Sequence, residues 1–148
     1  MAKIKIGYMG GVWDLFHVGH LNAMKEAKKY CDYLIVEATP DNIVYQQKNK
    51  KPIIGEDDRL EVIRAIRYVD RAELSDEKRD LGAFDKYGFD VLFISEDHRG
   101  KEYYNNLEKT MRAKGVEVIY IPYTKRISST KIRETMKDER KDKTHKVD

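Results

Sequence analysis

The sequence predicts an α/β domain built on a five-stranded parallel sheet with helices on both faces. Strand-like apolar segments alternate with helix-like amphipathic segments along the chain. One strand-like segment, residues 33–39, is apolar nearly throughout, as a buried parallel strand should be. A chain of 148 residues is long enough for one such domain with its own core. We therefore expect a Rossmann-like, doubly wound sheet, in which ligands bind beyond the carboxyl ends of the strands.

Five segments rich in apolar and β-branched residues are expected to be the strands. The first alternates apolar and polar side chains, the second and fourth are nearly continuously apolar, and the third is short. The expected strands cover residues 4–9, 33–39, 69–74, 91–95 and 116–122. Each candidate motif described below follows the carboxyl end of one of them.

Helices are expected between and after these strands. Acidic residues open the second helix, where the helix dipole favours negative charge, Gly115 ends the fourth, and serines suit the start of the last. The expected helices cover residues 21–27, 56–67, 79–87, 101–114 and 128–136. Residues 40–52 are expected to form a polar loop. The domain is expected to cover residues 1–136, and the charged segment 137–148 to extend the last helix slightly and then fray.

The charge balance argues against some classes of function. With 29 basic and 26 acidic side chains, the net charge of +3 is small, which does not suit a general nucleic-acid binder. No apolar run approaches the ~20 residues of a membrane span, and the first residues lead into a strand rather than a signal peptide. A single cysteine, Cys31, suits a reducing compartment. We expect a cytoplasmic protein with neither nucleic acid nor a membrane as its partner.

Two histidines in the turn after the first expected strand are the strongest functional signal. They belong to the run Gly10-Gly11-Val12-Trp13-Asp14-Leu15-Phe16-His17-Val18-Gly19-His20. Backbone amides and the positive end of a helix collect anions at such a turn, and glycine lets a ligand approach the main chain. The histidines could instead cap the helix or hold a metal ion, but no third ligand lies at metal-binding spacing. The pattern therefore favours a polyphosphate site.

Two motifs resemble those of a known family. The first run resembles the His-x-Gly-His motif of the nucleotidylyltransferase superfamily and, more narrowly, that of the cytidylyltransferases, closest to those acting on glycerol 3-phosphate. More than a hundred residues later, Ile127-Ser128-Ser129-Thr130 is similar to the segment that closes the nucleotide site in that family. The resemblance covers the chain from Lys3 to about Glu134.

This resemblance implies an enzyme that joins CTP to a phosphorylated alcohol and releases pyrophosphate, most closely one that forms CDP-glycerol from glycerol 3-phosphate. Phosphoethanolamine, phosphocholine or another polyol phosphate stays open as the acceptor, and ATP stays open as the nucleotide. A nucleotide-binding module without turnover is the alternative from another class of protein. Mg²⁺ would arrive with the nucleoside triphosphate, without a dedicated metal site in the protein. A homodimer is implied by the resemblance alone.

The resemblance also implies roles for individual residues. His17, His20 and Lys48 would be catalytic, the histidines by stabilising charge at the α-phosphate. Lys48 and Lys50, in the basic stretch 45–52, would bind the phosphate of the substrate. Arg67 belongs to the run Arg67-Tyr68-Val69-Asp70, which resembles a family segment whose arginine lies near the phosphates. The nucleotide would contact Gly11, Val12, Trp13, Asp14, Gly19, Arg67, Thr124, Arg126, Ser128, Ser129 and Thr130.

The chain departs from the family's pattern in two places. Tyr123 and Arg126 stand where relatives often carry an arginine and a glycine, so that a cation is retained but displaced. After the fourth expected strand, Ser95 and Glu96 stand where glycine and aspartate are more usual. Both departures fall at the expected edge of the ligand pocket.

Overall fold

The computed structural model describes residues 3–145 and contains one five-stranded sheet in which all strands are parallel. The strand order is β3-β2-β1-β4-β5, so the direction of winding reverses between β1 and β4. This arrangement confirms the expected Rossmann-like sheet and places the switch point beside β1. The strands are β1 (Ile6–Gly11), β2 (Tyr33–Ala38), β3 (Arg71–Leu74), β4 (Val91–Ser95) and β5 (Glu117–Ile121).

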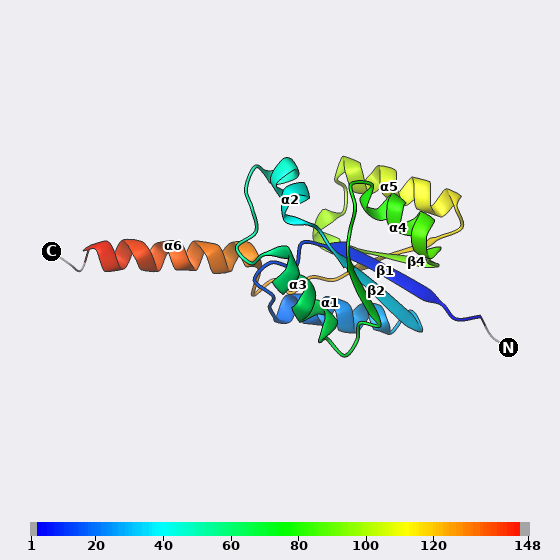
Figure 1. Cartoon of the computed structure of the whole chain (residues 1–148), viewed down its shortest axis with the longest axis horizontal. Helices are drawn as coiled ribbons and strands as arrows, with labels where there is room; N and C mark the ends of the chain where they lie inside the picture. The colour runs from blue at the N-terminus through cyan, green and yellow to red at the C-terminus, as the bar shows by residue number, and fades with distance from the viewer. Residues whose placement is uncertain (1–2, 146–148) are drawn as a thin grey trace.

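Helices cover both faces of the sheet (Figure 1). Met9 faces the layer that contains Met24 of α1 and Ile63 of α3, whereas its neighbour Tyr8 faces the layer that contains Met111 of α5. Successive side chains of a strand point to opposite faces of the sheet, so each face has its own layer of buried residues. The helices are α1 (Val18–Lys28), α2 (Asp41–Lys48), α3 (Glu56–Arg64), α4 (Arg79–Tyr87), α5 (Glu102–Ala113) and α6 (Ser129–His145), with a short 3₁₀ helix, η1 (Glu96–His98), after β4.

Residues 41–48 form the helix α2 where a polar loop was expected, so that expectation is wrong for this segment. Pro40 precedes the first turn with φ −59°, a value already suited to a helix start, and Ile43 and Val44 are buried. Two adjacent buried residues in a short polar segment give too weak a periodic signal to predict a helix. Lys48 therefore lies on the last turn of a helix, and Asn49 ends it in the left-handed conformation (φ +56°).

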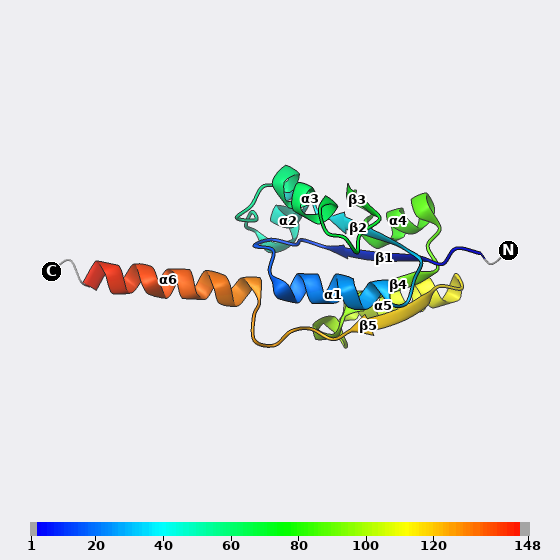
Figure 2. The same cartoon turned by 90° about the horizontal axis from the view of Figure 1, so that it is seen from below.

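The last helix is longer than expected, since α6 continues to His145. Only its first turns lie against the domain, and the remainder projects away from the sheet (Figures 1 and 2). The charged segment from residue 137 is helical up to His145, and residues 146–148 lie outside the described part of the chain. Over residues 3–145, none of the helices combines the length and apolar character needed to span a bilayer.

Candidate active site

A cavity of about 550 Å³ opens at the carboxyl edge of the sheet, beside the switch point between β1 and β4. The β1–α1 turn forms one wall, and the segment between β5 and α6 forms the next. The two sequence motifs, far apart along the chain, thus meet at one site. Their residues in its wall are Gly11, Val12, Trp13, Asp14, His17, Gly19, His20, Thr124, Ser128, Ser129 and Thr130.

The two histidines of the first motif cap α1 reciprocally. The Nδ1 atom of His17 accepts a hydrogen bond from the backbone N–H of Gly19 at 3.0 Å, and Nδ1 of His20 accepts one from the backbone N–H of His17 at 3.3 Å. The rings stack with their centroids 3.9 Å apart. Because each Nδ1 is an acceptor, each neutral ring carries its proton on Nε2. Capping thus leaves both Nε2–H groups as donors for a ligand.

Burial keeps both imidazoles neutral near pH 7. It is the main cause that lowers the pKa of His20 to about 4, and the neighbouring His17 lowers it further, against the opposing charge of Asp14. Burial also lowers the pKa of His17. Before a ligand binds, the pair therefore offers hydrogen-bond donors rather than two positive charges.

The turn that carries the histidines is tightly packed. A Cβ atom at Gly19 would lie 2.7 Å from Cε1 of His17, so a side chain there would displace the ring. Trp13 and Leu15 adopt the left-handed conformation with φ of +59° and +50°, which costs a non-glycine residue roughly 1–3 kcal/mol. Trp13 is held by the hydrogen bond from its Nε1 to the carbonyl oxygen of Glu37 at 3.0 Å.

Asp14 ties three segments of the site together. Its Oδ2 accepts hydrogen bonds from the backbone N–H of Ile53 at 2.8 Å and from Nη2 of Arg133 at 2.5 Å, and its Oδ1 accepts one from Ile54 N–H at 2.9 Å. Its own carbonyl oxygen accepts the hydroxyl hydrogen of Ser129 at 2.6 Å. Burial alone would raise the pKa of this carboxyl, but the bonds from Ile53, Ile54 and Arg133 outweigh it and lower the pKa. Asp14 is therefore a positioning residue that connects the motif turn, the loop after α2 and α6.

The second motif forms the start of α6. The Oγ atom of Ser128 accepts a hydrogen bond from the backbone N–H of Lys131 at 3.1 Å and caps the helix. The hydroxyl of Ser129 is used by Asp14, and Oγ1 of Thr124 accepts a hydrogen bond from Asn22 at 3.2 Å. What this motif offers a phosphate is thus mainly the amides and the positive end of α6.

A group of cations faces the cavity from several elements. Lys48 lies in the wall at the end of α2, together with Arg79, Lys101 and Arg133. Partial burial is the first cause that lowers the pKa of Lys48, and the charges of Arg133, Lys50, Arg79 and Lys101 lower it further. The cations therefore lie close enough to repel one another, which is the arrangement that an anionic ligand stabilises.

Arg67, predicted to contact the nucleotide, does not line the cavity. It follows the end of α3, and its Nη2 donates to the hydroxyl of Tyr68 at 2.9 Å. Lys50 and Arg126 are exposed and do not line the cavity either, although Lys50 acts on Lys48 through its charge.

Arg59, on α3, is a cation that supports the site from inside the protein. Its side chain is fully buried and pairs with Asp41 at 2.6 Å. Its Nη1 donates to the carbonyl oxygen of Val12 at 2.7 Å and its Nε to that of Ile54 at 2.9 Å. Arg59 thereby fixes the motif turn against α2 and the loop that follows it.

Several residues of the wall were not predicted. Arg133 follows Ser129 by four residues on α6, a spacing that places both on one side of a helix and could have been recognised. Others come from α4, η1, the residue before α5, and α5, and belong to no motif. They include Arg79, Asp80, His98, Lys101, Tyr103 and Tyr104.

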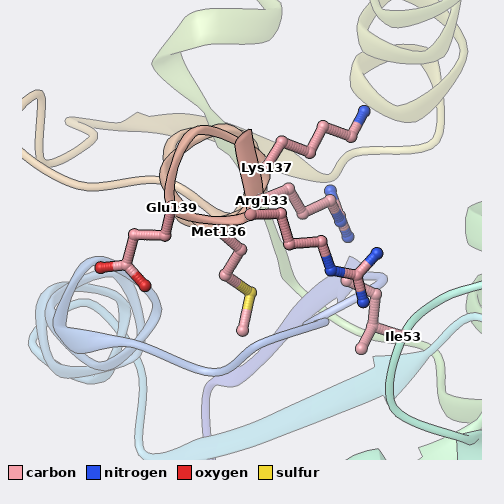
Figure 3. A pocket seen from close by; sticks show the side chains of 6 residues that line it. Ile53, Arg133, Met136, Lys137 and Glu139 are labelled. Atoms are coloured by element: carbon pink, nitrogen blue, oxygen red, sulfur yellow. The ribbon is translucent and has the colours of Figure 1, made fainter. Parts of the chain in front are cut away.

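A second, more open hollow of about 380 Å³ lies along α6 (Figure 3). The side chains labelled there come from α6, except Ile53, which comes from the loop after α2. Met136 and Ile53 are both more than half exposed. Its wall lacks the histidine pair and the helix start of the larger cavity, so the chemistry described above belongs to the larger one.

Comparisons with known proteins agree with this geometry. The model of the cytidylyltransferase-like family matches residues 8–135. An FAD synthase of Thermococcus kodakarensis is 37% identical over 126 residues, covering 82% of this chain and 81% of the relative. The glycerol-3-phosphate cytidylyltransferase of Bacillus subtilis is 34% identical, covering 84% of this chain and 91% of the relative. A crystal structure of a lipopolysaccharide core biosynthesis protein from Thermoplasma volcanium superimposes with a TM-score of 0.69 at 27% identity, covering 82% of this chain and 98% of that one.

Proposed function

Because this chain belongs to the cytidylyltransferase-like family, we propose that it transfers a cytidylyl group from CTP to a small phosphorylated alcohol, with glycerol 3-phosphate as the leading acceptor. The observation that carries the proposal is the histidine pair, whose Nδ1 atoms are used in capping and whose Nε2–H groups remain for a phosphate. The start of α6 faces the same cavity. Together they suit a triphosphate.

The reaction needs one displacement at phosphorus. An oxygen of the acceptor phosphate attacks the α-phosphorus in line, the bond to the bridging oxygen of the β-phosphate breaks, and pyrophosphate leaves with that electron pair. His17 and His20 donate hydrogen bonds to the α-phosphate as negative charge accumulates there. Lys48 and Arg133 neutralise the other phosphates, and the amides of α6 bind the leaving pyrophosphate. No covalent intermediate with the protein is required.

Mg²⁺ would enter this site as a companion of the nucleotide. Within residues 3–140, whose side chains the structure describes, no group of three histidine, cysteine or acidic side chains could hold a metal ion. Asp14, the carboxylate of the motif turn, is already bonded to Arg133 and to three backbone amides. The ion would lower the charge of the triphosphate while held mainly by phosphate oxygens and water.

The FAD synthase relatives raise a second candidate, the transfer of an adenylyl group from ATP to flavin mononucleotide, which is also a phosphorylated alcohol. A flavin ring needs a flat apolar slot. On the side of the cavity formed by α4 and α5, the aromatic faces are already used: Arg79 lies over the ring of Tyr103 with 4.5 Å to its centroid, and His98 stacks on Tyr104 at 4.4 Å. A small, polar acceptor fits that side better.

The test is pyrophosphate release from CTP or ATP, with Mg²⁺, against glycerol 3-phosphate, phosphoethanolamine, phosphocholine and flavin mononucleotide. We expect turnover with CTP and glycerol 3-phosphate above all other pairs. Turnover with CTP and another small acceptor would keep the reaction and change the substrate. Turnover with ATP and flavin mononucleotide would replace the proposal by the second candidate. Tight nucleotide binding without turnover of any pair would identify a binding module.

A further inference from the structure

One side of the cavity is distinct from the part that the two motifs form. We call it the acceptor lobe and define it by Lys48, Arg79, Asp80, Lys101, Tyr103 and Tyr104, all of which line the cavity from α2, α4, the residue before α5, and α5. Apart from Lys48, none of these residues belongs to a sequence motif. The lobe contains a buried carboxylate, Asp80, among three cations, whereas Asp97, the other carboxylate near these cations, is exposed.

Asp80 is the buried carboxylate of the lobe. Its side chain belongs to a residue that is only 8% exposed, in the first turn of α4. Oδ2 accepts the hydroxyl hydrogen of Tyr103 at 2.8 Å. The hydrogen bond from Tyr103 uses Oδ2. Oδ1 lies beside Gly10, 3.5 Å from the position that a Cβ atom would occupy at that glycine. Oδ1 of Asp80, which can accept a hydrogen bond, therefore lies in the wall of the cavity beside the carboxyl end of β1.

The start of α4 is shaped to present this pair of residues. Arg79 has φ +53°, a left-handed conformation that an arginine seldom adopts. In that conformation its guanidinium lies over the ring of Tyr103, whose hydroxyl in turn holds Asp80. Strained backbone of this kind persists where neighbouring contacts fix it, and it gathers at functional sites. Tyr103 thus positions a cation on its face and a carboxylate at its edge.

The charges of the lobe indicate what it would bind. Arg79 and Lys101 both act on Lys48 and on His98, so the three cations share one region. Among the residues that define the lobe, three positive charges and one buried carboxylate match a phosphate dianion together with an uncharged hydrogen-bond donor. An ammonium group would restore the excess of positive charge, whereas a hydroxyl would not.

We propose that Asp80, positioned by Tyr103, selects the acceptor by accepting a hydrogen bond from a hydroxyl of a small polyol phosphate, whose phosphate lies among Lys48, Arg79 and Lys101. This inference rests on the proposed function. Asp80 would thereby recognise the free hydroxyl of the acceptor.

The experiment compares two acceptors that differ only in hydroxyl groups, glycerol 3-phosphate and n-propyl phosphate. In the unaltered protein we expect kcat/KM to favour glycerol 3-phosphate by about 100-fold or more, because a site built around a hydroxyl rejects a ligand that lacks it. Asp80→Ala should reduce kcat/KM for glycerol 3-phosphate by at least about 10-fold, mainly through KM, and leave that for n-propyl phosphate within about threefold. Tyr103→Phe should shift the ratio in the same direction by a smaller factor.

The control is Asp85→Asn, which removes a carboxylate from the exposed side of the same helix and should leave the ratio unchanged. An equal loss for both acceptors in Asp80→Ala would reduce Asp80 to a structural residue and overturn the inference. A preference of the unaltered protein for phosphoethanolamine over glycerol 3-phosphate would also overturn it, since the carboxylate would then bind an ammonium group.

Binding separates a failure of this inference from a failure of the proposed function. If no acceptor is turned over, the proposed reaction is wrong, and calorimetry can still compare glycerol 3-phosphate with n-propyl phosphate in the unaltered protein and in Asp80→Ala. A binding preference for the hydroxylated ligand that Asp80→Ala abolishes would support the role of Asp80. The absence of any preference would exclude it.

Discussion

The two halves of the cavity are built in opposite ways. The nucleotide half uses contiguous residues at two strand-to-helix turns, where capping by His17, His20 and Ser128 already orients the ligand-binding groups. The acceptor lobe uses single residues from α2, α4 and α5, held by contacts between helices. In the first half, local backbone structure presents the groups that the proposed reaction needs. In the second, the positions of the side chains depend on tertiary packing.

The largest expected effect tests whether the nucleotide half performs the chemistry. His17→Ala removes one Nε2–H donor at the α-phosphate and should lower kcat by about 10²–10³. The measurement is pyrophosphate release at saturating substrates, with nucleotide binding measured in parallel. A variant that binds nucleotide equally well but turns over slowly would support transition-state stabilisation, whereas unchanged turnover would remove His17 from the catalytic machinery.

The histidine pair should also give the protein a specific sensitivity to acid. The folded His20 has a pKa of about 4, below the ~6.5 of an unfolded histidine, so the unfolded chain binds more protons between these values. Stability contributed by the neutral ring is therefore present above pH 6.5 and is lost as the pH falls toward 4. The loss would amount to at most about 3 kcal/mol.

Urea unfolding between pH 7 and 4 checks this expectation. In His20→Asn the free energy of unfolding should fall less over that interval than in the unaltered protein. Parallel pH dependence in the two proteins would contradict the assignment of a low pKa to His20.

Gly19→Ala tests how closely the caps are packed. The added methyl group would stand 2.7 Å from the ring of His17 and should cost about 1–3 kcal/mol of folding free energy, with a loss of activity as His17 rotates. Gly55→Ala is the matched control, because its Cβ would find its nearest neighbour 3.9 Å away and its φ of −62° suits alanine. Equal stability of the two variants would show that the turn is less rigid than its geometry indicates.

The smallest expected effect concerns the acceptor lobe. Arg79→Gly removes the left-handed strain at the start of α4 but also the contact with Tyr103, so thermal stability should rise or stay within about 1 kcal/mol. Lys86→Gly, at an exposed position within the same helix, should lose about 1 kcal/mol. Thermal unfolding of both variants measures the difference. A loss in Arg79→Gly as large as in Lys86→Gly would mean that position 79 stores no strain.

The same contrast explains which parts of the fold and of the site could be predicted from the sequence. Alternating segments predicted the parallel sheet and its five strands but missed α2, and the histidine turn could be recognised because its residues are adjacent in the chain. Arg67 was predicted at the site but does not line the cavity, because a short motif carries no information on which edge of the sheet it reaches. Asp80 and Tyr103 could not be paired, because they lie 23 residues apart on helices whose packing no local pattern specifies.

The connections of Asp14 have a consequence for how the protein is made. Two of its partners, Ser129 and Arg133, lie 115 and 119 residues further along the chain. A growing chain on the ribosome therefore carries the whole histidine turn long before the helix that secures it has been synthesised. Until then Asp14 can contact only nearer parts of the chain, including the backbone N–H groups of Ile53 and Ile54. The link between the histidine turn and α6 can therefore be made only after α6 has been synthesised.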